Sequence, residues 1–171
     1  MNSQTSAVGA VIFDAAGRVL LCQQSQGHRL WGLPGGKVRD KESPIRAVIR
    51  DIREETGMET RLVDLVGMYH LTGDGCGQGL PDVLVYVFRG ELLGGELAVN
   101  SPRIARLGWH DPEDLPQPVT PTTRTAIADA LAGCAGVLRD VWRDAEPDVP
   151  DAVDGDTAIP AQVAVSAPLL S

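Results

Sequence analysis

Apolar residues recur at helical spacing in one long segment, residues 44–56. They follow the pattern i, i+3, i+4, i+7 of a buried helix face; they are Ile45, Val48, Ile49 and Ile52. Ser43 suits the N-cap, Pro44 suits the first turn, and Gly57 suits the C-cap. The pattern therefore predicts an amphipathic helix of about three and a half turns.

Short apolar runs elsewhere in the chain predict β-strands. These runs cover residues 7–13, 19–22, 60–69, 82–92 and 103–109. A second helix is expected from Thr122 or Thr123 to about Arg143. Its apolar face would consist of Ile127, Leu131, Cys134, Val137, Leu138 and Val141. Strands combined with two helices predict an α+β fold, in which a mixed sheet carries a helix on each face.

The segment after residue 144 differs from the rest of the chain. Residues 145–171 contain four prolines, no cation and no sustained periodicity. We therefore expect a domain over residues 1–144 and a disordered acidic tail over 145–171. As an alternative, residues 163–165 could pair as an extra edge strand.

Composition narrows the function classes. The chain has 171 residues and a net charge of −8, and six of its acids lie beyond Arg143 without a basic partner. No basic patch predicts nucleic-acid binding, and no apolar run approaches the ~20 residues of a membrane span. The N-terminal residues do not resemble a signal peptide. Three separated cysteines, Cys22, Cys76 and Cys134, favour reduced thiols and a cytoplasmic location.

Three carboxylates share one side of the first predicted helix. Asp51, Glu54 and Glu55 are spaced i, i+3, i+4, and like charges at this spacing destabilise a helix by a few tenths of a kcal/mol per pair. Convergent carboxylates next to a glycine pair are typical of a site for a hard divalent cation, Mg²⁺ first. The alternative is a solvated acidic face.

The wider spacing is specific. Gly36 is followed by five residues, Glu42, seven residues, and then the segment Arg50-Asp51-Ile52-Arg53-Glu54-Glu55-Thr56-Gly57-Met58. This pattern resembles the Nudix box, and the preceding run from Trp31 to Gly36 resembles the family's entry loop. Every fixed position matches except Asp51, which replaces a glutamate. The chain is thus identified, by resemblance, as a member of the Nudix hydrolase family with an α/β/α sandwich fold.

The resemblance implies Mg²⁺-dependent hydrolysis, with Mn²⁺ as a substitute, of a nucleoside diphosphate linked to another moiety. It implies that Glu54 and Glu55 are paired metal ligands, Asp51 a third, and the Gly35 carbonyl a fourth. Arg50 would orient Glu54 through an i, i+4 pair.

Other roles implied by the resemblance are more open. Glu54 is the first candidate for the general base, and Glu96 in a later loop is the second. Many members carry a glutamate near the position of Arg103, which puts the second route in doubt. Glu42 could hold an outer metal or have a structural role. Because aspartate is shorter than glutamate, Asp51 could reach a metal through a bridging water, with slower hydrolysis or an altered metal preference.

Substrate contacts are predicted near the glycine pair. Lys37 and Arg29 could bind phosphate, with Lys37 favoured because it adjoins the pair. Trp31 could stack on a nucleobase or close the loop as a buried side chain.

The substrate and the assembly stay open. The signatures of the ADP-ribose and diadenosine-polyphosphate subgroups are absent, so a nucleoside triphosphate or a nucleotide-sugar-like diphosphate is expected, with the triphosphate favoured. The alternatives are a catalytically weak domain that senses a nucleotide, and a domain that acts through protein contacts of its acidic tail. The sequence does not decide whether the protein is a homodimer.

Overall fold

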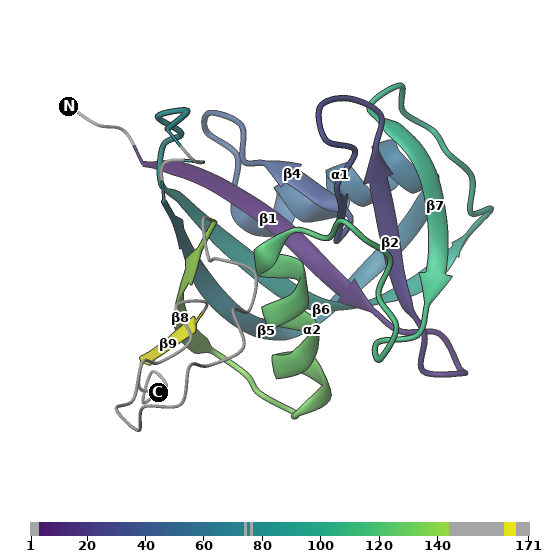
Figure 1. Ribbon diagram of the computed structural model, residues 1–171. Helices are drawn as coiled ribbons and strands as arrows, with labels where there is room; N and C mark the ends of the chain where they lie inside the picture. The colour runs from purple at the N-terminus through teal and green to yellow at the C-terminus, as the bar shows by residue number, and fades with distance from the viewer. Residues whose placement is uncertain (1–3, 74, 76, 144–162, 167–171) are drawn as a thin grey trace.

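The computed structural model describes residues 4–73, 75, 77–143 and 163–166. Its elements appear in Figure 1. They are β1 (Thr5–Ile12), β2 (Val19–Gln24), β3 (Trp31–Gly32), β4 (Gly35–Lys37), α1 (Pro44–Thr56), β5 (Met58–Thr72), β6 (Val83–Gly95), β7 (Ile104–His110), α2 (Pro121–Leu131), β8 (Val137–Trp142) and β9 (Val163–Ser166). Neither α1 nor α2 is long and apolar enough to cross a membrane, and no other described segment is a helix that could.

The strands form two sheets. The larger has the order β4-β1-β6-β5-β8-β9 and the smaller has the order β3-β2-β7. In the larger sheet β1 pairs parallel with β6, and β5 pairs parallel with β8, whereas β4, β9 and the β5–β6 pair are antiparallel. The predicted mixed sheet is therefore confirmed.

Alternation along β1 divides the core into two layers. Successive side chains of a strand point to opposite faces of its sheet. Val8, Ala10 and Ile12 pack with the α1 residues Ala47, Val48 and Ile52, whereas Val11 packs with the α2 residues Ala126, Ile127 and Ala130. Figure 1 shows α2 in front of the sheet and α1 behind it. The α+β sandwich expected from the sequence is confirmed.

Helix α1 begins and ends at the predicted caps. The Ser43 hydroxyl accepts the N–H of Arg46 at 3.2 Å, and Gly57 adopts a φ of 72° at the C-cap. One predicted core residue is wrong, because Ile45 is 55% exposed. It lies in the first turn, where the helix extends past the edge of the core. In its place the buried residues of α1 include Asp51 and Glu55.

The second helix is shorter than predicted. It ends at Leu131, and the residues expected to continue it form strand β8. Gly133 and Gly136 both have positive φ, 74° and 66°, and they reverse the chain between the two elements. Val137 and Val141 are buried as predicted. Their spacing of four residues places them on one face of a strand as well as of a helix, which explains the error.

The edge strand considered for the tail is present. Strand β9 pairs antiparallel with β8, with Val163 opposite Val141. The remainder of the predicted disordered tail, residues 145–162 and 167–171, lies outside the described residues.

Candidate active site

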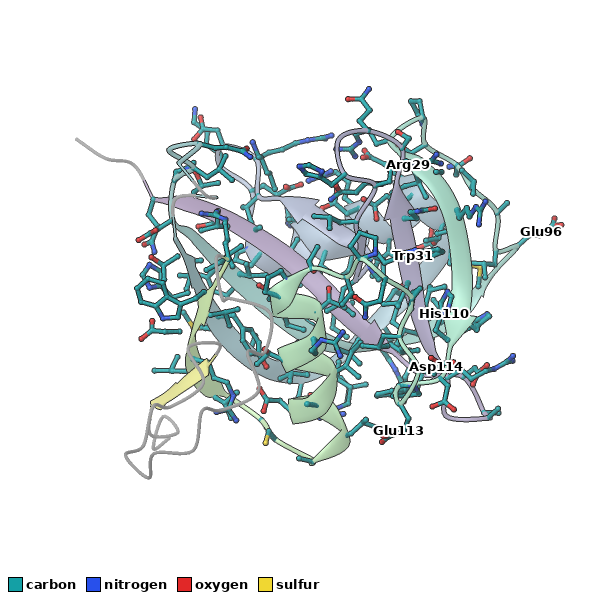
Figure 2. All side chains as sticks on the ribbon, in the orientation of Figure 1. Arg29, Trp31, Glu96, His110, Glu113 and Asp114 are labelled. Atoms are coloured by element: carbon teal, nitrogen blue, oxygen red, sulfur yellow. The ribbon has the colours of Figure 1, made fainter. Side chains whose placement is uncertain are left out.

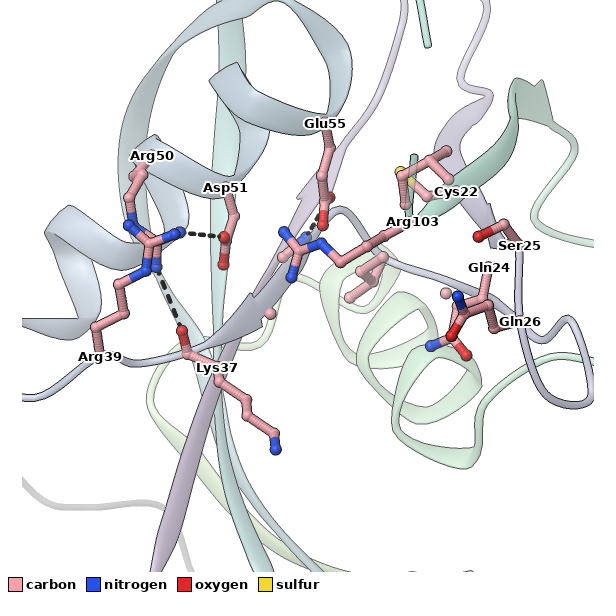
Figure 3. A pocket seen from close by; sticks show the side chains of 15 residues that line it. Cys22, Gln24, Ser25, Gln26, Lys37, Arg39, Arg50, Asp51, Glu55 and Arg103 are labelled. Carbon is pink, nitrogen blue, oxygen red and sulfur yellow. Dashed lines mark hydrogen bonds and ion pairs between the residues drawn. The ribbon is translucent and has the colours of Figure 1, made fainter. Parts of the chain in front are cut away.

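A cavity of about 480 Å³ opens beside α1. Its wall combines residues of α1, β4, the end of β2 and the start of β7 (Figure 3). A volume of this size lies within the roughly 300–1,000 Å³ of small-molecule sites. Two carboxylates and four cations line it: Asp51, Glu55, Lys37, Arg39, Arg50 and Arg103.

The buried carboxylates belong to Asp51 and Glu55, which are 1% and 4% exposed. They fit against the sheet because Gly35 and Gly36 have no side chains. A Cβ on Gly36 would lie 3.0 Å from Asp51 Oδ2, and a Cβ on Gly35 would lie 2.0 Å from the carbonyl oxygen of Val8. The glycine pair therefore makes room for β4 to pass close to both β1 and α1.

Each buried carboxylate has one fixed oxygen. Glu55 Oε2 accepts the N–H of Gly35 at 3.1 Å, and Asp51 Oδ1 accepts from Arg50 Nη1 at 2.7 Å. Asp51 Oδ2 is buried and has no hydrogen-bond partner among the described residues. Burial raises the pKa of Glu55 to about 8, and burial also raises the pKa of Asp51, although the charges of Arg50 and Arg103 oppose this second shift. The positive charge nearby therefore offsets only part of the cost of burying the two carboxyls.

Arg50 connects the acidic residues of the site. Its guanidinium donates to Glu42 at 2.8 and 2.9 Å, to Asp51 at 2.7 Å and to Glu54 at 3.3 Å. Hydrogen bonds from Arg50 lower the pKa of Glu42 to about 2. The predicted i, i+4 contact between Arg50 and Glu54 is present. Glu42 does not line the cavity, and its contacts match the structural alternative.

Glu54 occupies the edge of the site. Its side chain is 41% exposed and contacts Arg39 at 3.6 Å in addition to Arg50. Within the part of the chain that the structure describes, no three His, Cys, Asp or Glu side chains form a metal-binding group. The carboxylate of Glu54 contacts these two arginines, whereas Asp51 and Glu55 line the cavity (Figure 3).

The residues present fit a hard divalent cation. Hard cations take oxygen ligands, and Mg²⁺ needs only one or two carboxylates because it keeps several waters. Asp51 and Glu55 supply two carboxylates, and the unpartnered Oδ2 of Asp51 is an oxygen without another use in the described structure. Asp51, Glu54, Glu55 and the Gly35 carbonyl remain the predicted ligands.

Besides Glu54, three predicted substrate or base residues do not line the cavity (Figure 2). Trp31 is 7% exposed and contacts the edge of the His110 ring, with centroids 4.9 Å apart, which matches the alternative of a buried tryptophan. Arg29 is exposed on the loop after β2, outside the cavity. Glu96 projects outward on an exposed loop. Of the predicted phosphate contacts, only Lys37 lines the cavity.

Several lining residues were not expected from the sequence. Arg39, Gln24, Ser25 and Gln26 join the wall, and the buried thiol of Cys22 lies there too. Burial, followed by the charge of Glu55, raises the pKa of this thiol. These residues lie far from Asp51 and Glu55 in the sequence or outside regular elements, so no periodicity in the chain places them at the site.

Comparison with known proteins identifies the family. A family model described as the NUDIX domain matches residues 3–130. The chain belongs to the Nudix family. Among curated relatives, a Bacillus subtilis (strain 168) protein named as a candidate 8-oxo-dGTP diphosphatase is 29% identical over 133 residues, covering 78% of this chain and 84% of the relative. A MutT-like protein of Streptomyces ambofaciens is 28% identical over 132 residues, covering 77% and 80%.

Solved structures of Nudix proteins agree with the fold. The MutT NUDIX hydrolase from Burkholderia pseudomallei has a TM-score of 0.67 and 34% identity, covering 75% of this chain and 98% of that one. As a member of this family, whose relatives are named as diphosphatases and pyrophosphohydrolases, the protein is a Nudix-type diphosphate hydrolase.

Proposed function

We propose that the protein hydrolyses the diphosphate bond of a nucleoside triphosphate with the help of a divalent cation, Mg²⁺ or in its place Mn²⁺. The observation that carries the proposal is the pairing of buried Asp51 and Glu55 in a cavity that also holds Lys37, Arg39 and Arg103. A bound cation needs the carboxylates, and an anionic phosphate chain needs the cations.

Each side chain of the site would have a separate role in the reaction. Asp51 and Glu55 would hold the cation, which when bound supplies charge neutralisation at the phosphate oxygens and a water of lowered pKa. Arg50 holds Asp51 and Glu54 in place through its hydrogen bonds. Glu54 is the proposed general base, because its exposed carboxylate at the cavity edge can accept a proton from water. Lys37 would bind phosphate from β4.

Relatives support a nucleotide substrate. The Bacillus subtilis relative is named for 8-oxo-dGTP, and a CTP pyrophosphohydrolase of Escherichia coli (strain K12) is 38% identical over 65 residues. A nucleotide-sugar-like diphosphate is the alternative substrate class. We also propose that residues 1–144 form the catalytic domain, since the family match ends within these residues. A chain truncated after residue 144 should then retain hydrolysis. The separated cysteines support a proposed cytoplasmic location.

A substrate panel tests the proposal. Full-length protein is assayed with ordinary and oxidised nucleoside triphosphates, nucleotide sugars and dinucleotides, with Mg²⁺ or Mn²⁺, and products are identified. We expect triphosphate cleavage that a chelator abolishes, and a loss of roughly 10²-fold or more in Glu54→Gln. Nucleotide binding without hydrolysis of any panel member would instead favour a nucleotide sensor.

A further inference from the structure

Hydrogen bonds hold residues 100–103, which precede β7, on both sides of the cavity. The N–H of Asn100 donates to the carbonyl oxygen of Glu55 at 3.1 Å. On the other side, the N–H of Ser25 donates to the Arg103 carbonyl at 2.9 Å, and the Ser25 hydroxyl donates to that of Pro102 at 2.7 Å. The backbone of Arg103 is therefore held at a fixed place across the cavity from α1.

The side chain of Arg103 extends from this place into the cavity. Figure 3 shows its guanidinium turned toward Asp51 and Glu55, and its positive charge lowers the pKa of both carboxyls against the larger effect of burial. Within the described residues, the Arg103 guanidinium has no hydrogen bond and no ion pair as close as 4.0 Å. Arg50, by contrast, is fully engaged by Glu42 and its neighbours on α1. The Arg103 guanidinium thus faces the two carboxylates without a hydrogen-bond or ion-pair partner among the described residues.

We propose that Arg103 opposes cation binding in the ligand-free protein and binds the phosphate chain of the substrate. The proposal rests on the function proposed above. A guanidinium facing Asp51 and Glu55 repels a divalent cation that approaches the same carboxylates. A phosphate group offers it planar, charge-assisted hydrogen bonds, for which arginine is well suited.

The Arg103 guanidinium can move from the carboxylates to a bound phosphate because its side chain is exposed to solvent, while its backbone is held by Ser25. When phosphate oxygens draw the guanidinium away from the carboxylates, the repulsion of the cation falls. By linkage, substrate and cation then favour each other's binding. Coupling energies of this kind correspond to roughly 5–150-fold in affinity.

Two binding measurements on full-length protein test the proposal. The first is the affinity for Mn²⁺ alone, and the second is the affinity for a non-hydrolysable nucleoside triphosphate analogue in the presence of a chelator. In Arg103→Gln we expect Mn²⁺ to bind roughly tenfold more tightly, and the analogue to bind roughly tenfold more weakly. Effects of opposite sign distinguish this role from a general loss of structure, which would weaken both.

Matched variants sharpen the test. Arg106→Gln removes another exposed arginine, on β7 and outside the cavity lining, and should change neither affinity. Arg103→Lys keeps the charge, so its Mn²⁺ affinity should stay within about twofold of wild type. If Arg103→Gln leaves either affinity unchanged or shifts both in the same direction, the inference is overturned while the proposed function stands. A wild type that binds neither probe would overturn both.

Discussion

Arg50 and Asp51 are neighbours in the sequence, and their side chains meet in a 2.7 Å ion pair. Adjacent residues on a helix ordinarily point in different directions. The contact forms because a hydrogen bond to Glu42 holds the Arg50 guanidinium, and because the Asp51 side chain is buried against Gly36. It fixes one oxygen of Asp51 and leaves the other, Oδ2, without a partner among the described residues.

The unpartnered oxygen leads to a first prediction, for Asp51→Asn. The variant should bind Mn²⁺ at least tenfold more weakly than wild type, because a neutral amide replaces one of two buried carboxylates. In the presence of a chelator its stability should change little, because the relief from burying a carboxylate offsets the loss of the ion pair with Arg50. Calorimetric Mn²⁺ titration and thermal melts measure the two effects.

Asp51→Glu is the matched control, because it keeps the charge and adds one methylene. The Asp51 carboxylate already lies close to Gly36, so the longer side chain should lower the free energy of unfolding by about 1–3 kcal/mol. Mn²⁺ affinity equal to wild type in both variants would show that position 51 is not a ligand.

The glycine pair gives a second prediction. Gly35→Ala places a Cβ 2.0 Å from the carbonyl oxygen of Val8, where only backbone movement can relieve the clash. We expect a loss of about 3 kcal/mol or more in the free energy of unfolding, or failure to fold. Gly36→Ala meets only the Asp51 carboxylate at 3.0 Å, so it should be milder. Urea denaturation of both variants compares them, and equal losses would contradict this reading of the turn.

The helix at residues 44–56 and its caps could be predicted because they depend on local periodicity and local hydrogen bonds. Of the acidic residues expected beside the apolar stripe, Asp51 and Glu55 proved to be buried and Glu54 did not. The helical pattern shows which side chains lie together but not how closely a sheet approaches them. Arg103 illustrates the remaining limit. It lies 48 positions after Glu55 in the chain, and the backbone contacts of Ser25 and Asn100 bring it opposite that residue.

A buried network supports a third prediction, on stability. Asp129 of α2 accepts from Tyr69 of β5 at 2.8 Å and twice from Arg139 of β8 at 2.7 Å. Asp129→Ala leaves two polar partners unpaired, so the free energy of unfolding should fall by about 3 kcal/mol. The control Glu59→Ala breaks a pair with Arg53 in which both side chains are more than half exposed, and should leave the free energy of unfolding nearly unchanged. Similar losses in the two variants would contradict the prediction.

A fourth prediction concerns pH. Burial raises the pKa of Glu55 from 4.5 to about 8, so the folded protein holds this proton more tightly than the unfolded chain. The stabilisation is full below pH 4.5 and is lost as pH rises toward 8. In chelator, Glu55→Gln should therefore lose less stability than wild type between pH 5 and about 8, and be the more stable protein at the upper end. Urea midpoints at several pH values measure this, with exposed Glu91→Gln as the control. Parallel pH profiles for wild type and Glu55→Gln would contradict it.

The last prediction concerns Glu42, which holds Arg50 but does not line the cavity. In Glu42→Gln the guanidinium loses its bidentate carboxylate partner, so it should orient Asp51 and Glu54 less precisely. For the best substrate of the panel we expect kcat to fall roughly tenfold, while KM changes less than about twofold, since Glu42 does not itself line the cavity. The control Glu59→Gln removes a carboxylate from an exposed arginine pair and should leave both constants unchanged. An unchanged kcat in Glu42→Gln would mean that Arg50 is positioned without Glu42, through its contacts with Asp51, Glu54 and the Lys37 carbonyl alone.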